Sequence, residues 1–262
     1  MEKGKFQKNL TIILTIIFLY APIIVLVLFS FNESKMNIIF TGFTFKWYGE
    51  LFKNADLLEA FFNTIIIAFT STIVSTIIGT ISAIGLHKYD FKFKGFINSL
   101  IYIPIVIPEI VLGISLLSVY TISNLKLGMG SLILSHIAFS IPFVITSVRS
   151  SLALLPKEYE EAAYDLGANK YSVLTKVIIP LIMPGIISGA TLALTLSLDD
   201  VVISYFTAGP GSNTLPLKIY SMIKTGITPD VNALSTLMLL VTIIALTTSA
   251  IYQSRKIAKR GF

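Results

Sequence analysis

The sequence predicts an all-α integral membrane protein with six transmembrane helices and with both termini in the cytoplasm. Three observations lead to this fold class: an apolar composition, six apolar stretches of membrane-spanning length, and an uneven distribution of lysine and arginine. Of the 262 residues, 54% are hydrophobic and 13% are charged, and the mean hydropathy is +0.82. Soluble domains contain about 25% charged residues, so a bilayer is the environment that suits this chain.

Each apolar stretch is long enough for a membrane-spanning helix, which needs about 20 apolar residues. The stretches cover residues 10–30, 61–86, 97–121, 131–151, 181–206 and 233–252. The first follows several lysines, as the apolar part of a secretory signal does. Its apolar run is too long for a signal peptide, and no small-residue cleavage site follows it. We therefore expect it to be retained as the first span.

Lysine and arginine predict the orientation, because they collect on the cytoplasmic side of membrane proteins. Of the 20 such residues, 14 lie in the N-terminal segment, after the second and fourth spans, or in the C-terminal tail, and 6 lie on the other side. Both termini are therefore expected in the cytoplasm. The formal net charge of +6 follows from this pattern. We expect membrane lipid as a partner and no nucleic acid, since no soluble basic face is available for it.

The spans divide the chain into three parts. Residues 1–59 hold the first transmembrane helix and an outer loop, residues 60–252 form the main transmembrane domain, and residues 253–262 form a basic cytoplasmic tail. Residues 152–180 make the longest cytoplasmic connection, and residues 207–232 make an outer loop with a glycine- and proline-rich turn.

Several kinds of chemistry are excluded or disfavoured. The chain has no cysteine, which excludes disulfides, thiolate metal sites and cysteine nucleophiles. It has two histidines and no recognisable catalytic cluster, so neither an enzymatic activity nor a metal site is expected. The phosphate-binding pattern G-x-x-x-x-G-K-[ST] is absent. The chain is therefore not expected to hydrolyse ATP itself.

The cytoplasmic connection 152–180 is predicted to fold into two short helices. Glu158, Glu160 and Glu161 favour the positive end of a first helix, and Gly167 suits its C-terminal stop. Asn169 suits the N-cap of a second helix. An amphipathic helix on the lipid surface is the alternative interpretation, but such helices are usually rich in lysine and arginine. The acidic first helix favours docking to another protein.

This connection resembles the EAA motif of binding-protein-dependent ABC-transporter permeases, usually written EAA-x3-G-x9-I-x-L-P. The matching residues are Glu161, Ala162, Ala163, Gly167, Val177, Ile179 and Pro180. Valine and isoleucine replace the motif's isoleucine and leucine, which are mild apolar exchanges. The resemblance implies a type I ABC importer permease fold over the 60–252 domain. It also implies that Glu161, Ala162, Ala163, Gly167 and Pro180 belong to a coupling helix region that docks on a separate ATPase. ATP would be used by that ATPase, and no cofactor would be bound by this chain.

Three acids stand inside the predicted spans, where a charge costs about 2.5–3.5 kcal/mol. They are Glu109 in the third span and Asp199 and Asp200 in the fifth. No lysine or arginine lies inside any span except Arg149, at the end of the fourth stretch, which is counted with the loop that follows. We expect them to line a path for a cation. Neighbouring residues point about 100° apart on a helix, so one aspartate is expected to line the path while the other caps or pairs. Tyr205 and Phe206 follow and offer ring faces to an ammonium group.

Structural explanations stay open for each acid. Glu109 follows Pro108 and could satisfy backbone groups around a proline-broken turn. The two aspartates could simply sit at the wet outer end of the fifth span. His136, in the fourth span, is more often a hydrogen-bonded packing residue than a ligand.

The second half of the chain is similar to the spermidine/putrescine permeases of the PotC type. The similar stretches are residues 197–204, 209–210, 215–222 and 229–234. The resemblance implies a subunit of a polyamine importer in the bacterial cytoplasmic membrane. Its partners would be a PotB-type sister permease, an ATPase dimer and an extracytoplasmic polyamine-binding protein. Two other functions stay open: an ABC permease for another substrate, and a carboxylate-lined secondary transporter, for which we find no inverted repeat.

Overall fold

The computed structural model describes residues 2–35, 39–222, 229–240, 243–244 and 247. Within these residues the structure is helical, apart from one isolated bridge between Asn32 and Phe43. The chain divides into two compact units. Unit 1 comprises residues 1–58 and 221–262, and unit 2 comprises residues 59–220.

Unit 1 contains the first apolar helix, α1 (Glu2–Phe29), the short α2 (Lys46–Leu51) and a helical segment at residues 229–240. The apolar side chains of α1 from Leu10 onward are largely exposed, as suits a helix in lipid. The loop before α2 is fixed by Trp47, whose indole Nε1 donates to the carbonyl of Asn32 at 2.6 Å.

Unit 2 is built around three long helices, namely most of α3 (Ala55–Lys88), α6 (Met129–Ala153) and α9 (Ile179–Asp199). Helices α6 and α9 pack along much of their length. Small residues permit this: a Cβ added at Gly185 would lie 2.1 Å from Ser151 Oγ, and one at Gly189 would lie 3.2 Å from Val144 Cα. Close approach through small residues is the usual packing mode of membrane helices.

Four helices have the length and apolarity of a membrane span, and a bent pair forms a fifth candidate. The four cover Lys8–Phe29, Ala55–Lys88, Met129–Ala153 and Lys170–Asp199. They confirm helices long and apolar enough to cross a membrane at the first, second, fourth and fifth predicted stretches. Most of the sixth predicted stretch, residues 233–252, lies outside the described residues, so the count of six spans stays a prediction.

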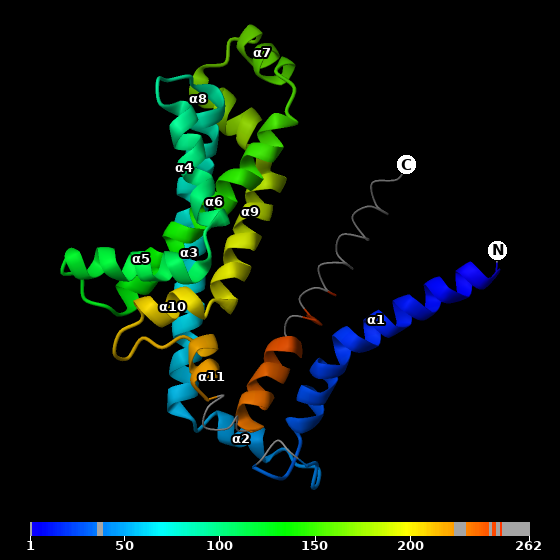
Figure 1. Cartoon of the computed structure of the whole chain (residues 1–262). Helices are drawn as coiled ribbons and strands as arrows, with labels where there is room; N and C mark the ends of the chain where they lie inside the picture. Colours follow the sequence, from blue (N-terminus) through cyan, green and yellow to red (C-terminus); the bar gives the residue numbers. More distant parts are fainter. Residues whose placement is uncertain (1, 36–38, 223–228, 241–242, 245–246, 248–262) are drawn as a thin grey trace. The chain divides into compact units, whose positions relative to one another are not determined.

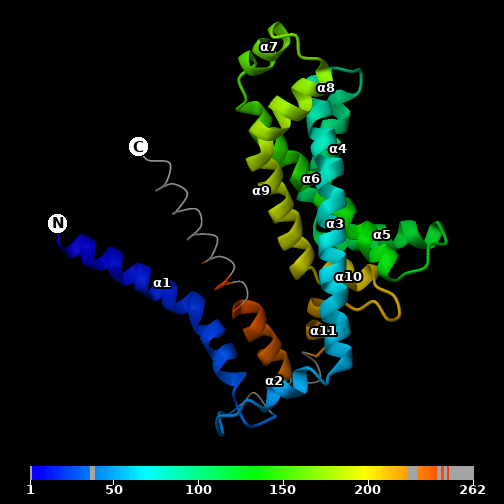
Figure 2. The same ribbon diagram turned by 180° about the vertical axis from the view of Figure 1, so that it is seen from behind.

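The expectation of one continuous helix over residues 97–121 is wrong. Helix α4 (Lys94–Val106) ends before Pro108, and α5 (Glu109–Ile122) leaves at an angle of 112°. The cause is local, because proline disfavours the helical conformation in the residue before it. Ile107 accordingly has an extended backbone, with ψ 137°. Figures 1 and 2 show α5 projecting sideways from the long helices of its unit.

The fifth predicted stretch, residues 181–206, is also broken. Helix α9 ends at Asp199, Asp200 is extended, and the short α10 (Val202–Thr207) begins two residues later. The sequence contains no proline or glycine at this point, which is why apolarity alone predicted an unbroken span. Helix α11 (Leu215–Met222) follows after a turn.

The connection 152–180 folds as predicted, into helix α7 (Glu158–Asp165), a glycine stop and helix α8 (Lys170–Val173). Gly167 has φ +80°, a conformation that favours glycine. The side chain of Asn169 caps α8 by accepting from Ser172 N at 2.8 Å. A π-helical turn, η1 (Leu174–Ile178), then leads into α9. Both views show α7 and α8 at one end of unit 2, the end at which α3 connects to α4 (Figures 1 and 2).

Candidate functional site

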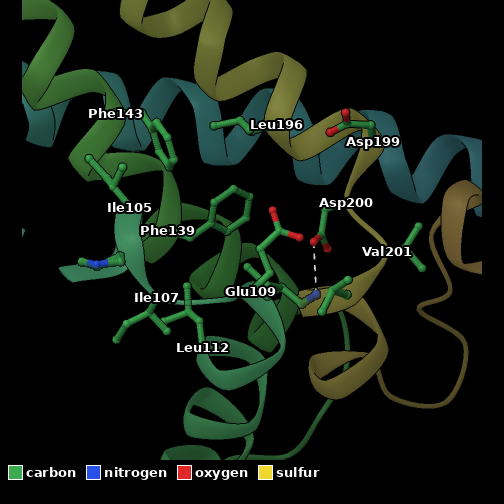
Figure 3. Close-up of a pocket in the computed structure, with 13 residues that line it drawn as sticks. Ile105, Ile107, Glu109, Leu112, Phe139, Phe143, Leu196, Asp199, Asp200 and Val201 are labelled. Carbon is green, nitrogen blue, oxygen red and sulfur yellow. Dashed lines mark hydrogen bonds between the residues drawn. The ribbon is translucent and has the colours of Figure 1, made fainter. Parts of the chain in front are cut away.

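A cavity of about 350 Å³ lies where the two helix breaks of unit 2 meet. One wall comes from the α4–α5 break, with Pro104, Ile107 and Glu109. The opposite wall comes from the α9–α10 break, with Asp199 and Asp200. The structure therefore brings the three sequence-predicted acids to one cavity (Figure 3). No lysine or arginine is among the described residues that line it.

Glu109 and Asp199 are both exposed side chains at helix ends. Glu109 is the first residue of α5, where a carboxylate interacts favourably with the helix dipole. Asp199 is the last residue of α9. Figure 3 shows the Glu109 carboxylate extending toward Asp200, with Asp199 at the end of the α9 ribbon. These two side chains are free to meet a ligand in the cavity.

Asp200 is buried, with 8% of its surface exposed, and caps α10. Its carboxylate accepts from Ile203 N at 3.1 Å, from Ser204 N at 2.7 Å and from Ser204 Oγ at 2.7 Å. A carboxylate in this position satisfies helix donors that have no partner within the helix. The two adjacent aspartates therefore lie in different surroundings, because the helix break at Asp200 separates them.

His136 of α6 stabilises both sides of the α9–α10 break. It is fully buried, and its Nδ1 lies 2.6 Å from Ser197 Oγ while its Nε2 lies 3.1 Å from Ser204 Oγ. The same Nε2 lies 3.5 Å from Asp200 Oδ2. Ser197 Oγ lies a further 3.3 Å from Ser71 Oγ on α3. His136 is thus a hydrogen-bonded packing residue behind the cavity wall.

Tyr205 and Phe206 lie on α10 but are not among the residues that line the cavity. The Phe206 ring covers Gly113 of α5, where an added Cβ would lie 2.6 Å from ring atom Cδ2. Tyr205 is 62% exposed and meets the Phe206 ring edge to face, with centroids 5.3 Å apart. Phe206 therefore joins α10 to α5, while Tyr205 points away from its own unit's interior.

The aromatic rings that do line the cavity are Phe139 and Phe143 of α6. Sequence reasoning missed them because phenylalanine in an apolar span carries no signal of its own. Their spacing was the available signal. Phe139 and Phe143 lie four residues apart, which places them on one helix face.

The predicted docking residues lie on α7, directly after it, or at the start of α9. Glu161, Ala162 and Gly167 are exposed, and Ala163 packs against the hydrophobic core of unit 2. Pro180 stands in the first turn of α9. Large apolar side chains beside α7 are also exposed, including Leu154 at 84% and Leu166 at 90%.

Among the described residues, no group of three or more histidine or acidic side chains has a metal-binding arrangement.

Comparison with known proteins identifies the family. The family of binding-protein-dependent transport system inner membrane components matches residues 75–260. The spermidine/putrescine transport system permease protein PotC of Shigella flexneri is 41% identical over 93% of this chain and 92% of its own length. The PotC protein of Escherichia coli K12 is 43% identical over 87% and 86%. The putrescine transport system permease protein PotI of the same strain is 38% identical over 85% and 82%.

Solved structures show the same fold at low sequence identity. A chain of a bacterial alginate ABC transporter, in complex with a periplasmic protein that holds an alginate pentasaccharide, has a TM-score of 0.73 at 19% identity. The match covers 97% of this chain and 94% of that chain. A second structure, of a bacterial ABC transporter that imports alginate, gives a TM-score of 0.70 at 17% identity, over 96% and 98% of the two chains. With a family match over most of its length, this chain belongs to the binding-protein-dependent transport system inner membrane components.

Proposed function

We propose that this chain is a membrane permease subunit of an ATP-driven importer for polyamines such as spermidine and putrescine. The observation that carries the proposal is the cavity with three carboxylates and no basic residue among its described lining. Polyamines are polycations at neutral pH, and carboxylates hold such cargo by charge and hydrogen bonding. The similarity of 38–43% to polyamine permeases supports the same cargo.

Asp199 and Glu109 are the residues proposed to hold an ammonium group of the cargo. Both are exposed in the cavity, whereas Asp200 is occupied by the backbone and hydroxyl donors of α10. The rings of Phe139 and Phe143 provide an apolar wall for the methylene chain. Tight binding would slow release, so we expect this subunit to hold the cation weakly and the binding protein to set most of the selectivity.

The energy is proposed to come from an ATPase dimer that docks on α7. Glu161, Ala162 and Gly167 offer an exposed surface to it, and Ala163 and Pro180 connect that surface to the helix core. Closure of the dimer would push on α7 and tilt the spanning helices, so that the cavity opens alternately to each side. A PotB-type sister permease would complete the path, and a loaded binding protein would dock on the outer loops, including 207–232.

This mechanism requires six spans with both termini and α7 in the cytoplasm. The absence of cysteine makes that topology easy to test. A cysteine introduced at Leu166 should react with a membrane-impermeant maleimide only in inside-out vesicles. A cysteine introduced at Asn213, which is exposed, should react only in right-side-out cells. The reverse labelling pattern would contradict the proposed topology.

Uptake in proteoliposomes tests the function itself. The chain would be reconstituted with its sister permease, ATPase and binding protein, and labelled spermidine and putrescine would be compared with an amino acid and an anion. We expect ATP-dependent accumulation of the polyamines alone. ATP-dependent uptake of another compound would keep the coupling role and refute the cargo, whereas uptake without ATP would refute the coupling role.

A further inference from the structure

Glu160, the residue before the EAA motif, contacts another helix of this chain instead of facing outward. Glu160 is partly buried and forms an ion pair with Lys88, the last residue of α3, which lies 72 residues earlier in the chain. The Tyr164 hydroxyl donates to the same carboxylate oxygen at 3.2 Å. Glu161, one residue further on, is exposed. The two neighbouring glutamates therefore point to different partners.

The ion pair reaches across the fold, whereas the other attachments of α7 are mainly local. Helix α7 packs against α8 and η1, which follow it directly in the chain, and its Ala163 touches the hydrophobic core. Other lysine ion pairs, Lys53–Glu50 and Lys94–Asp90, join residues three or four apart. Those pairs brace only their own segments, while the Lys88–Glu160 pair joins α7 to a membrane-spanning helix.

The electrostatics favour a charged pair at neutral pH. The Lys88 ammonium, through its hydrogen bond and its charge, holds the pKa of the Glu160 carboxyl below its ordinary value, against the opposing effect of partial burial. About 30% of each side chain is exposed, and exposed pairs of this kind contribute little to stability. The pair is therefore suited to fixing the position of α7 more than to holding the fold together.

We propose that Lys88 is a positioning residue for energy coupling, which by holding Glu160 makes α3 move together with the ATPase-docking helix α7. This inference rests on the proposed function of α7. Movement of α7 then reaches the membrane by two routes. One follows the chain through α8 and η1 into α9, and the other crosses the ion pair into α3. Both α3 and α9 reach the serine and histidine network behind the cavity, through Ser71 and Ser197.

The test measures polyamine uptake and ATP hydrolysis in the same reconstituted complex, and so gives the number of cargo molecules moved per ATP. Lys88→Glu and Glu160→Lys are each expected to lower this ratio at least five-fold, because like charges would push α7 away from α3. The double variant, with the two charges exchanged, is expected to recover at least half of the wild-type ratio. A merely structural role would reduce the amount of assembled complex, and so uptake and ATP hydrolysis together, without changing their ratio.

The Lys94–Asp90 pair is the matched control, because it is also a lysine–carboxylate contact beside the end of α3 but does not involve α7. Lys94→Glu is expected to keep the wild-type ratio. Single variants at Lys88 and Glu160 with a wild-type ratio, or a double variant as impaired as the single variants, would overturn the proposal. Failure of the wild-type complex to move polyamine with ATP would instead refute the proposed function, so the two failures are distinguishable.

Discussion

The two functional regions of unit 2 are held in opposite ways. The cavity wall is fixed by buried polar contacts, with His136 fully buried and Asp200 occupied by three donors of α10. Helix α7 is held by the packing of Ala163 on the core, by the Gly167 stop and by one partly exposed ion pair. Buried polar networks are costly to break because an unpaired buried group cannot hydrogen-bond to water instead. Damage to the buried network behind the cavity wall should therefore appear as lost stability, and damage at α7 as lost coupling.

Asp200→Ala should have the largest effect. It leaves the donors of Ile203 and Ser204 without their acceptor beside a fully buried histidine. Each buried donor left without an acceptor costs about 1–3 kcal/mol. We therefore expect a lower unfolding temperature of the purified chain and little folded protein. Asp200→Asn keeps an N-cap acceptor and should lose much less. Equal unfolding temperatures for Asp200→Ala and the wild type would show that the cap is unimportant.

Asp199→Asn tests an exposed carboxylate of the same cavity, which should affect uptake and not stability. The side chain is exposed and ends α9, so the unfolding temperature should stay within about 2 °C of the wild type, as for most surface changes. Uptake should nevertheless fall about ten-fold, because one cargo carboxylate is lost. Wild-type uptake by both Asp199→Asn and Asp200→Asn would refute the proposed part of these acids in holding the cation.

Gly167→Val tests the glycine stop. A β-branched residue at φ +80° costs about 1–2 kcal/mol, which weakens the contacts of Gly167 N with Tyr164 O and of Ala168 N with Ala163 O. The membrane helices do not depend on these contacts, so insertion and the unfolding temperature should stay near wild type. Polyamine moved per ATP should fall several-fold. Undiminished coupling in correctly inserted protein would argue against α7 as the docking helix.

The smallest effect concerns pH. Because Lys88 lowers the pKa of Glu160, the pair is formed above the ordinary carboxyl pKa of 4.5 and is lost as pH falls through the lower folded value. Tyr164 and His87 also face this carboxylate. The contribution is at most about 1 kcal/mol. Protease cleavage within residues 157–170 of the detergent-solubilised chain should therefore be nearly constant from pH 8 to 5 and should rise only in more acidic solution. In Glu160→Gln, which has no carboxylate at this position, cleavage should not show this rise below pH 5.

The sequence predicted the helical class, four of the spans and the α7–Gly167–α8 arrangement, because these depend on apolar length and on local capping chemistry. It also predicted that Asp199 and Asp200 would differ. It missed the two helix breaks. Pro108 signalled the first, but only the structure shows the 112° bend. The second has no glycine or proline, and depends on Asp200, Ser204 and His136, which are brought together by tertiary packing.

The aromatic part of the site could not be predicted from the sequence either, because it also depends on tertiary packing. Tyr205 and Phe206 follow the acids in sequence, but the break at Asp200 turns α10 so that Phe206 packs on Gly113 instead. Phe139 and Phe143 reach the cavity from α6, more than 50 positions away from Asp199 in the chain. Such neighbours follow from how α6 and α9 pack, and not from any local pattern.

The most direct test of the division between the two regions is the ratio of spermidine to putrescine uptake rates in the reconstituted, ATP-driven complex. Spermidine carries three amines and putrescine two, so a lost cavity carboxylate should affect them unequally, whereas a coupling defect should affect both alike. We expect Asp199→Asn to change the ratio at least two-fold and Lys88→Glu to leave it at the wild-type value while both rates fall. An unchanged ratio in Asp199→Asn, or an altered ratio in Lys88→Glu, would contradict the assignment of cargo binding to the cavity and of energy coupling to α7.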